Sequence, residues 1–301
     1  MIYTCYGLRI ASEIELPELI REEGGAGSSV AGVSIRIGKI ADDGPPARGR
    51  QISPRLWVTP DRLWMKVPGV ACYDVAGGNT VVVDPEEGAD HDSIRLSLLG
   101  SALGALLCQR GLLVLHGNAV RVGDRCLVCV GPSGAGKSTL AAGFLRHGHE
   151  ILADDVVPVD ETCRVLPGFP RLKLWRDVAS RLDIDTARLR RVRPDVEKYS
   201  VPLAGGSAGQ ALPVRWVYVL ESHDRPEVRL EEVEGMGRFL PLRRNSYGVR
   251  VLEGMALEAE NLLLCGRLAR QVRLARVTRP VQGFHLEALV DRILEDVEEH
   301  P

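Results

Sequence analysis

The chain has 301 residues, of which 45% are hydrophobic and 26% are charged, so it can bury one large core or two modest ones. Its formal net charge of -2 argues against non-specific nucleic-acid binding, which needs a broad basic surface. The sequence contains neither a long uncharged apolar run nor a signal-peptide pattern, so we expect a cytoplasmic protein with no membrane partner.

The first 90 residues alternate short apolar runs with clusters of Gly, Pro and Asp, a pattern typical of short strands. The predicted strands cover residues 33–37, 56–59, 63–67 and 80–83. Two further segments, 24–29 and 42–50, have the composition of surface loops. We therefore predict a β-rich N-terminal domain over residues 1–90.

From residue 92 the pattern changes, because apolar residues recur at helical spacing until Gly111. An apolar strand is predicted at 112–115, and a turn at Gly123-Asp124 leads into a second strand at 125–130. This strand contains Cys126 and Cys129, which we interpret as buried strand residues because no second cysteine pair follows at zinc-ribbon spacing. The seven cysteines are scattered and odd in number, so we expect reduced thiols.

A glycine-rich loop follows, and helices and strands are predicted to alternate in the rest of the chain. We predict a helix at 137–147, a strand at 150–153, a strand at 216–220 and an amphipathic helix at 286–299. Residues 91–301 are therefore predicted to form an α/β domain.

The glycine-rich loop fits the pattern GxxxxGK followed by Ser or Thr, and it lies between a predicted strand and a predicted helix. Its glycines let the backbone wrap around phosphates, so that successive N–H groups and the helix N-terminus point at the anion. Lys137 adds a positive charge, and the Ser138 hydroxyl can bind Mg²⁺. We predict an ATP·Mg²⁺ site made of Gly131, Pro132, Ser133, Gly134, Ala135, Gly136, Lys137, Ser138 and Thr139.

Two adjacent carboxylates, Asp154 and Asp155, follow the next predicted strand. Neighbouring residues at a strand end point to different sides, so one carboxylate can face the metal and the other an incoming hydroxyl. The alternative is that one of the two caps a turn. His116 lies at the predicted end of the 112–115 strand, where the residue pattern alone leaves its role open.

Three segments together resemble the catalytic core of the HPr kinase/phosphorylase family: Leu115-His116-Gly117, the glycine-rich loop, and residues 148–155. The resemblance covers roughly residues 100 to 300. It implies a P-loop kinase core similar to that of phosphoenolpyruvate carboxykinase, here preceded by a smaller β-rich region. It also implies transfer of phosphate to a serine hydroxyl on a protein.

Carried over to this sequence, the resemblance implies that Asp155 accepts the serine proton, that His116 assists it and that Lys137 holds the outer phosphates. Ser138 then binds Mg²⁺, with Asp154 as the second metal ligand. The family's Glu-Ile-Arg-Gly-Leu-Gly signature, which supplies a metal-binding glutamate, has no counterpart in residues 170–175. Candidate basic partners for the phosphate are Arg171, Lys173, Arg243 and Arg244, and Arg243-Arg244-Asn245 is a poor match to the family's phosphorylase segment.

Residues 6–13 and 170–175 are similar to the HPr-kinase-related proteins found with lasso-peptide biosynthesis, which are associated with phosphorylating the C-terminal serine of a precursor peptide. The expected function is thus an ATP-dependent serine kinase that acts on a peptide or protein. The alternatives are a regulatory kinase of the HPr(Ser) kinase/phosphorylase type, and a small-molecule kinase or P-loop NTP hydrolase. HPr kinases assemble into oligomers, and the sequence leaves open whether this chain forms a homo-oligomer.

Overall fold

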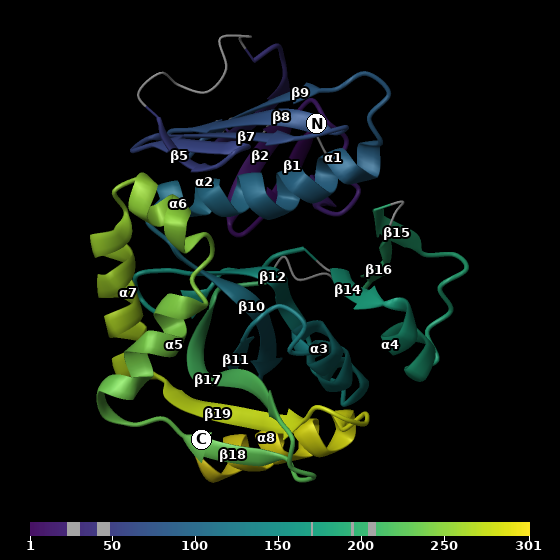
Figure 1. The fold of residues 1–301 in the computed structure, drawn as a ribbon, viewed down its shortest axis with the longest axis vertical. Helices are drawn as coiled ribbons and strands as arrows, with labels where there is room; N and C mark the ends of the chain where they lie inside the picture. The colour runs from purple at the N-terminus through teal and green to yellow at the C-terminus, as the bar shows by residue number, and fades with distance from the viewer. Residues whose placement is uncertain (23–30, 41–48, 170, 194–195, 204–208) are drawn as a thin grey trace.

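The computed structural model describes residues 1–22, 31–40, 49–169, 171–193, 196–203 and 209–301. The predicted loop at 24–29 and most of the one at 42–50 lie outside these residues. The described part of the chain is a mixed α/β structure, with an N-terminal sheet as the upper layer in Figure 1 and a second sheet below it. No helix among the described residues is both long and apolar enough to cross a membrane.

The N-terminal sheet has the strand order β3-β1-β2-β4-β9-β8-β7-β6-β5. The pairs β2–β4 and β4–β9 are parallel and the other neighbours are antiparallel. Its strands are β1 (Ile2–Cys5), β2 (Leu8–Ser12), β3 (Ile20–Arg21), β4 (Val33–Ile37), β5 (Arg50–Ser53), β6 (Leu56–Thr59), β7 (Arg62–Val67), β8 (Ala71–Ala76) and β9 (Thr80–Pro85). The four strands predicted in this region are confirmed, with small extensions of β7 and β9.

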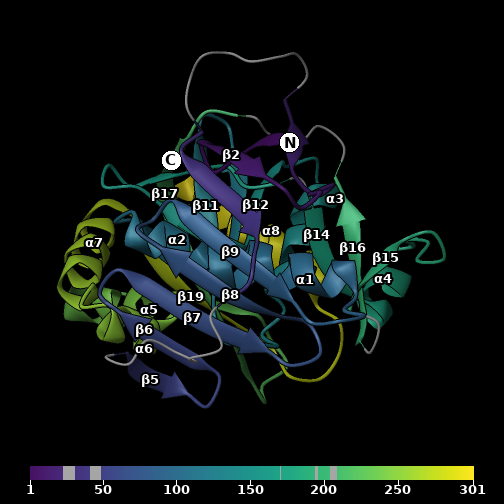
Figure 2. The same cartoon turned by 90° about the horizontal axis from the view of Figure 1, so that it is seen from above.

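A continuous helical segment covers the lower face of this sheet, and it consists of α1 (His91–Ser97), a π-helical turn (Leu98–Ala102) and α2 (Leu103–Gln109). In the view from above, the strands β7 to β9 lie across these helices (Figure 2). The apolar side chains of the helices share one core with those of the sheet, and Leu252 and Met255 from the far end of the chain join it. This core therefore extends across the predicted division at residue 90, and that division stays a prediction.

The second sheet has the strand order β11-β10-β12-β13-β17-β19-β18, and β11 also pairs with β17. The pairs β11–β17 and β17–β19 are parallel. The strands are β10 (Leu113–Val122), β11 (Arg125–Val130), β12 (Ile151–Val159), β13 (Arg164–Val165), β17 (Leu212–His223), β18 (Arg229–Glu232) and β19 (Arg273–Pro280). A separate small sheet, in the order β14-β16-β15, is built from β14 (Arg171–Trp175), β15 (Arg190–Arg193) and β16 (Val196–Pro202).

Helices cover both faces of the second sheet. One face packs against α3 (Lys137–Arg146), α4 (Arg176–Arg181) and α8 (Leu286–Glu299). The other packs against α5 (Phe239–Arg244) and α7 (Glu258–Gln271), while α6 (Val249–Gly254) joins the N-terminal core. A short 3-10 helix (Gly235–Arg238) precedes α5. The predicted helices at 137–147 and 286–299 are confirmed.

Two strands next to the glycine-rich loop are longer than predicted. Strand β10 continues to Val122, so His116 lies within the strand rather than at its end. Strand β12 continues to Val159, so Asp154 and Asp155 also lie inside a strand. The predicted end of this strand at the acidic pair is wrong because β12 stays paired with β10, with Asp154 opposite Asn118 and Asp155 opposite Gly117.

Candidate active site

The glycine-rich loop connects β11 to α3. Its three glycines, Gly131, Gly134 and Gly136, have φ angles of +151°, +82° and +99°, a region that L-residues with side chains rarely adopt. A Cβ at Gly131 would also lie 2.5 Å from the backbone oxygen of Leu220 on β17. The backbone geometry and the packing against β17 therefore require glycine at these positions.

Lys137, at the start of α3, is folded back over this loop. Its Nζ donates hydrogen bonds to the carbonyl oxygens of Gly131 at 2.8 Å and Pro132 at 3.0 Å. Burial lowers the pKa of Lys137, although the nearby charges of Asp155 and Asp154 oppose this. Its ammonium group thus lies over the loop whose backbone would cradle the phosphates.

Asn118 on β10 holds the start of α3, because its Nδ2 donates to the backbone oxygen of Lys137 at 2.5 Å. The residue is fully buried, and its Oδ1 has no hydrogen-bond partner among the described residues. Asn118 was not among the residues predicted for the site. No local sequence pattern marks Asn118 as a site residue, because its hydrogen-bond partner, Lys137, lies 19 residues further along the chain.

The two predicted metal ligands lie side by side. The Ser138 hydroxyl donates to Oδ1 of Asp154 at 3.3 Å, and the backbone N–H of Lys173 donates to the other carboxylate oxygen at 3.1 Å. Burial, together with the negative charge of Asp155, raises the pKa of Asp154 to about 6. A hydroxyl next to a carboxylate is a set of oxygen donors, and Mg²⁺ prefers oxygen ligands.

Asp155 has a φ angle of +67° inside β12, a left-handed conformation that is uncommon for residues other than glycine. Its Oδ2 forms an ion pair with Nζ of Lys173 on β14 at 2.7 Å. Burial alone would raise the pKa of Asp155, but the charges of Lys173 and Lys198 outweigh it and lower the pKa to about 2. Asp155 is therefore ionised at neutral pH.

His116 contacts Asp155 through the backbone. Its Nδ1 lies 3.1 Å from the carbonyl oxygen of Asp155, which can only accept, so Nδ1 carries the proton. Burial and the positive charge of Lys137 lower the pKa of His116, so the ring is neutral at pH 7. Its backbone N–H is held by the carbonyl oxygen of Asn245 at 2.8 Å.

Part of this constellation lines one cavity of about 580 Å³, a volume within the usual range for small-ligand sites. Gly131, Pro132 and Asp154 are not among its lining residues. Of the predicted site residues, His116, Asp155 and the loop from Ser133 to Thr139 line it. The sequence analysis missed several other lining residues: Trp175, Asp177, Arg181, Lys198, Arg279 and Phe284. Most of these come from the small third sheet with α4 and from the segment after β19, which carry no recognisable motif.

The four predicted basic partners have different positions. Lys173 holds Asp155, whereas Arg171 donates to the carbonyl oxygen of Pro17 and lines a separate small cavity together with Lys173. Arg243 pairs with Glu258 at 2.9 Å on the far face of the second sheet, and Arg244 is not among the residues lining the 580 Å³ cavity. The structure therefore brings only Lys173 of these four residues to the acidic pair.

We expect Gly117→Ala to destabilise the protein by about 2 kcal/mol, as overpacking of a tight core does. An added Cβ would lie 2.4 Å from the backbone oxygen of Cys129, between β10 and β11 and opposite Asp155. Chemical denaturation followed by tryptophan fluorescence measures this. Gly100→Ala is the matched control, because a Cβ there meets nothing within 4 Å. Equal stability of the two variants would contradict the prediction.

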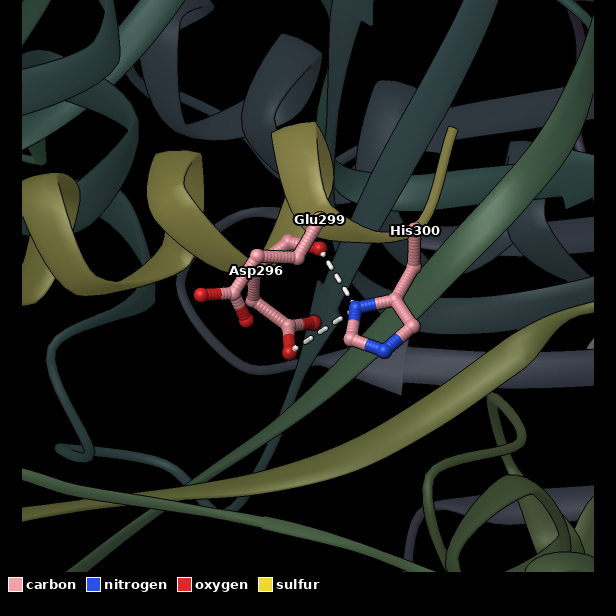
Figure 3. Close-up of side chains that lie close together, drawn as sticks. All are labelled: Asp296, Glu299 and His300. Atoms are coloured by element: carbon pink, nitrogen blue, oxygen red, sulfur yellow. Dashed lines mark hydrogen bonds and ion pairs between the residues drawn. The ribbon is translucent and has the colours of Figure 1, made fainter.

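A cluster at the end of α8, formed by Asp296, Glu299 and His300, has the composition of a metal site (Figure 3). The buried Asp296, however, accepts hydrogen bonds from Arg273 at 2.8 Å on each oxygen and from Tyr218 at 2.9 Å. A guanidinium that occupies both oxygens repels a cation. We therefore interpret this cluster as the contact that holds α8 to the second sheet.

Comparisons with known proteins give likenesses to solved structures. No protein-family model and no curated protein matches the chain. The structure is similar to that of the HPr(Ser) kinase/phosphatase from Coxiella burnetii, with 12% sequence identity and a TM-score of 0.25, over 62% of this chain and 96% of that chain.

Proposed function

We propose that the protein is an ATP-dependent kinase that transfers the γ-phosphate of ATP to a serine hydroxyl of a peptide or protein. The observation that carries the proposal is the meeting of two units in one cavity. One is the phosphate loop with Lys137 and with Ser138, whose hydroxyl donates to Asp154 behind it, and the other is Asp155, which Lys173 holds in its ionised form. Together they supply a phosphate site, a metal site and a proton acceptor.

In the proposed reaction, the loop N–H groups and Lys137 hold the phosphates while Asp155 accepts a hydrogen bond from the acceptor hydroxyl. The hydroxyl oxygen bonds to the γ-phosphorus, the bond from phosphorus to the departing ADP oxygen breaks, and the proton passes to Asp155. Ser138 and Asp154 would hold Mg²⁺, which when bound neutralises charge on the phosphate oxygens. A carboxylate with a low pKa suffices for this step, because the transition state is loose and positioning supplies much of the catalysis.

For the acceptor we propose the C-terminal serine of a lasso-peptide precursor, on the basis of the sequence resemblance in residues 6–13 and 170–175. Contacts of Tyr6, in the first of these segments, place that segment next to the acidic pair. The Tyr6 hydroxyl donates to the backbone oxygen of Val156, next to Asp155, and the Tyr6 ring packs against Phe169. The N-terminal domain thus contacts the strand that carries the acidic pair.

Intact-mass spectrometry tests the proposal. The protein is incubated with ATP·Mg²⁺ and a panel of lasso-precursor peptides that end in serine, with HPr from a related bacterium as a second acceptor. We expect a gain of one phosphate on the peptide terminus, and its loss in Lys137→Ala, because that variant lacks the charge over the phosphate loop.

The other outcomes separate the competing functions. If only HPr gained phosphate, the protein would be a regulatory kinase of the HPr(Ser) kinase/phosphorylase type and not a peptide kinase. Release of inorganic phosphate with no phosphorylated acceptor would overturn the kinase proposal in favour of NTP hydrolysis, and phosphorylation of an added small alcohol would favour a small-molecule kinase.

A further inference from the structure

We propose that the nucleotide base stacks on the pair formed by the Phe284 ring and the Arg181 guanidinium, which both line the 580 Å³ cavity. The inference rests on the proposed function and adds the element that recognises the base. Phe284 follows β19 and Arg181 ends α4, and both residues line the same cavity as the phosphate loop.

The two side chains contact each other in the wall of the cavity. The guanidinium carbon of Arg181 lies 5.1 Å from the centroid of the Phe284 ring, and Phe284 keeps 39% of its surface exposed. Arg181 forms no ion pair with a carboxylate among the described residues. A phenyl ring and a guanidinium are both flat groups that stack on the π-face of a base.

The segment that carries Phe284 is fixed on one side to the phosphate loop and on the other to α3. Before it, Nε of Arg279 donates to the carbonyl oxygen of Ala135 at 3.2 Å. After it, Leu286 at the start of α8 packs so closely on α3 that a Cβ at Gly143 would lie 2.7 Å from its side chain. The stacking surface therefore has a fixed position relative to the phosphates.

The direction of the nucleotide follows from the positions of the charged groups. Asp155 and His116 line the cavity from β12 and β10, so the terminal phosphate belongs on that side. The base then points toward the wall formed by the end of α4 and the segment after β19. Because stacking uses the π-face, which every base has, Phe284 should contribute equally to adenine and guanine binding.

Calorimetric titration of the full chain tests this inference with three probes: the non-hydrolysable imido analogues of ATP and GTP, and inorganic tripolyphosphate, each with Mg²⁺. We expect Phe284→Ala to weaken both nucleotides by about tenfold and to leave tripolyphosphate unchanged. Phe284→Tyr should restore nucleotide affinity, and Arg181→Ala should weaken both nucleotides but also tripolyphosphate slightly, since it removes a charge. Val281→Ala is the matched control, because Val281 is 57% exposed in the same segment and does not line the cavity.

An unchanged nucleotide affinity in Phe284→Ala would overturn the inference, as would an equal loss for nucleotides and tripolyphosphate, which indicates distortion of the loop. If the wild-type protein bound none of the three probes, the proposed function would be overturned, and the base site with it. The two failures are therefore distinguished by the wild-type titration.

Discussion

Asp155→Asn is expected to lower phosphoryl transfer about 10³-fold, within the range for loss of a general base. Asparagine has almost the same shape but cannot take the acceptor proton, and it leaves the Nζ of Lys173, now 2.7 Å from the Asp155 carboxylate, without its ionic partner. Nucleotide affinity should stay within about threefold, because the phosphates are held by the loop and Lys137 rather than by Asp155. Single-turnover transfer and calorimetric titration measure the two quantities separately.

Asp177→Asn is the matched control for this prediction. Asp177 lines the same cavity from α4 but is exposed, and no contact to the phosphate loop is seen among the described residues. Its substitution should therefore change the transfer rate little. If Asp155→Asn kept a near-normal rate, or if both variants lost the same activity, Asp155 would not be the proton acceptor.

The phosphate loop could be predicted from the sequence because its chemistry is local. The glycines, Lys137 and Ser138 are consecutive, and the positive φ angles that the loop needs are available to glycine at low cost. The flanking strand and helix also follow from local apolar patterns, and the structure has them at β11 and α3.

The surroundings of the acidic pair could not be predicted, because they depend on strand pairing between distant segments. Asp-Asp is typical of turns, but pairing of β12 with β10 carries the strand through it. Lys173 and Lys198 reach the site only because β14 pairs with β16 in the third sheet. An isolated lysine in a strand gives no signal of this, so Lys173 was one of four equal candidates and Lys198 was not considered.

The left-handed backbone conformation of Asp155 also depends on the pairing of β12 with β10. A left-handed residue inside a strand costs free energy, and it persists only where its neighbours enforce it. Gly117 lies directly opposite and leaves room between the strands, while His116 donates to the Asp155 carbonyl oxygen. The position of the carboxylate is thus set by β10, one strand away from the residue itself.

Asp296→Asn is expected to reduce the free energy of unfolding by about 3 kcal/mol at neutral pH, the usual cost of breaking a buried ion pair. The side chain is 1% exposed and joins α8 to two strands of the second sheet, through Arg273 on β19 and Tyr218 on β17. Denaturation followed by the fluorescence of Trp216, whose Nε1 donates to the carbonyl oxygen of His300 at 2.9 Å, measures the change where it occurs.

The pKa of Asp296 determines how this loss of stability changes with pH. Burial alone would raise the pKa of Asp296, but hydrogen bonds from Arg273 and Tyr218 outweigh it and lower the pKa below its ordinary value. The ion pair therefore stabilises the fold fully above the unfolded-state pKa of about 3.9, and its contribution is lost as the pH falls through the lower folded-state pKa. The difference between wild type and Asp296→Asn should shrink accordingly. Glu299→Gln, an exposed carboxylate on the same helix, should cost little at any pH, and a pH-independent difference for Asp296→Asn would show that its cost comes from packing rather than charge.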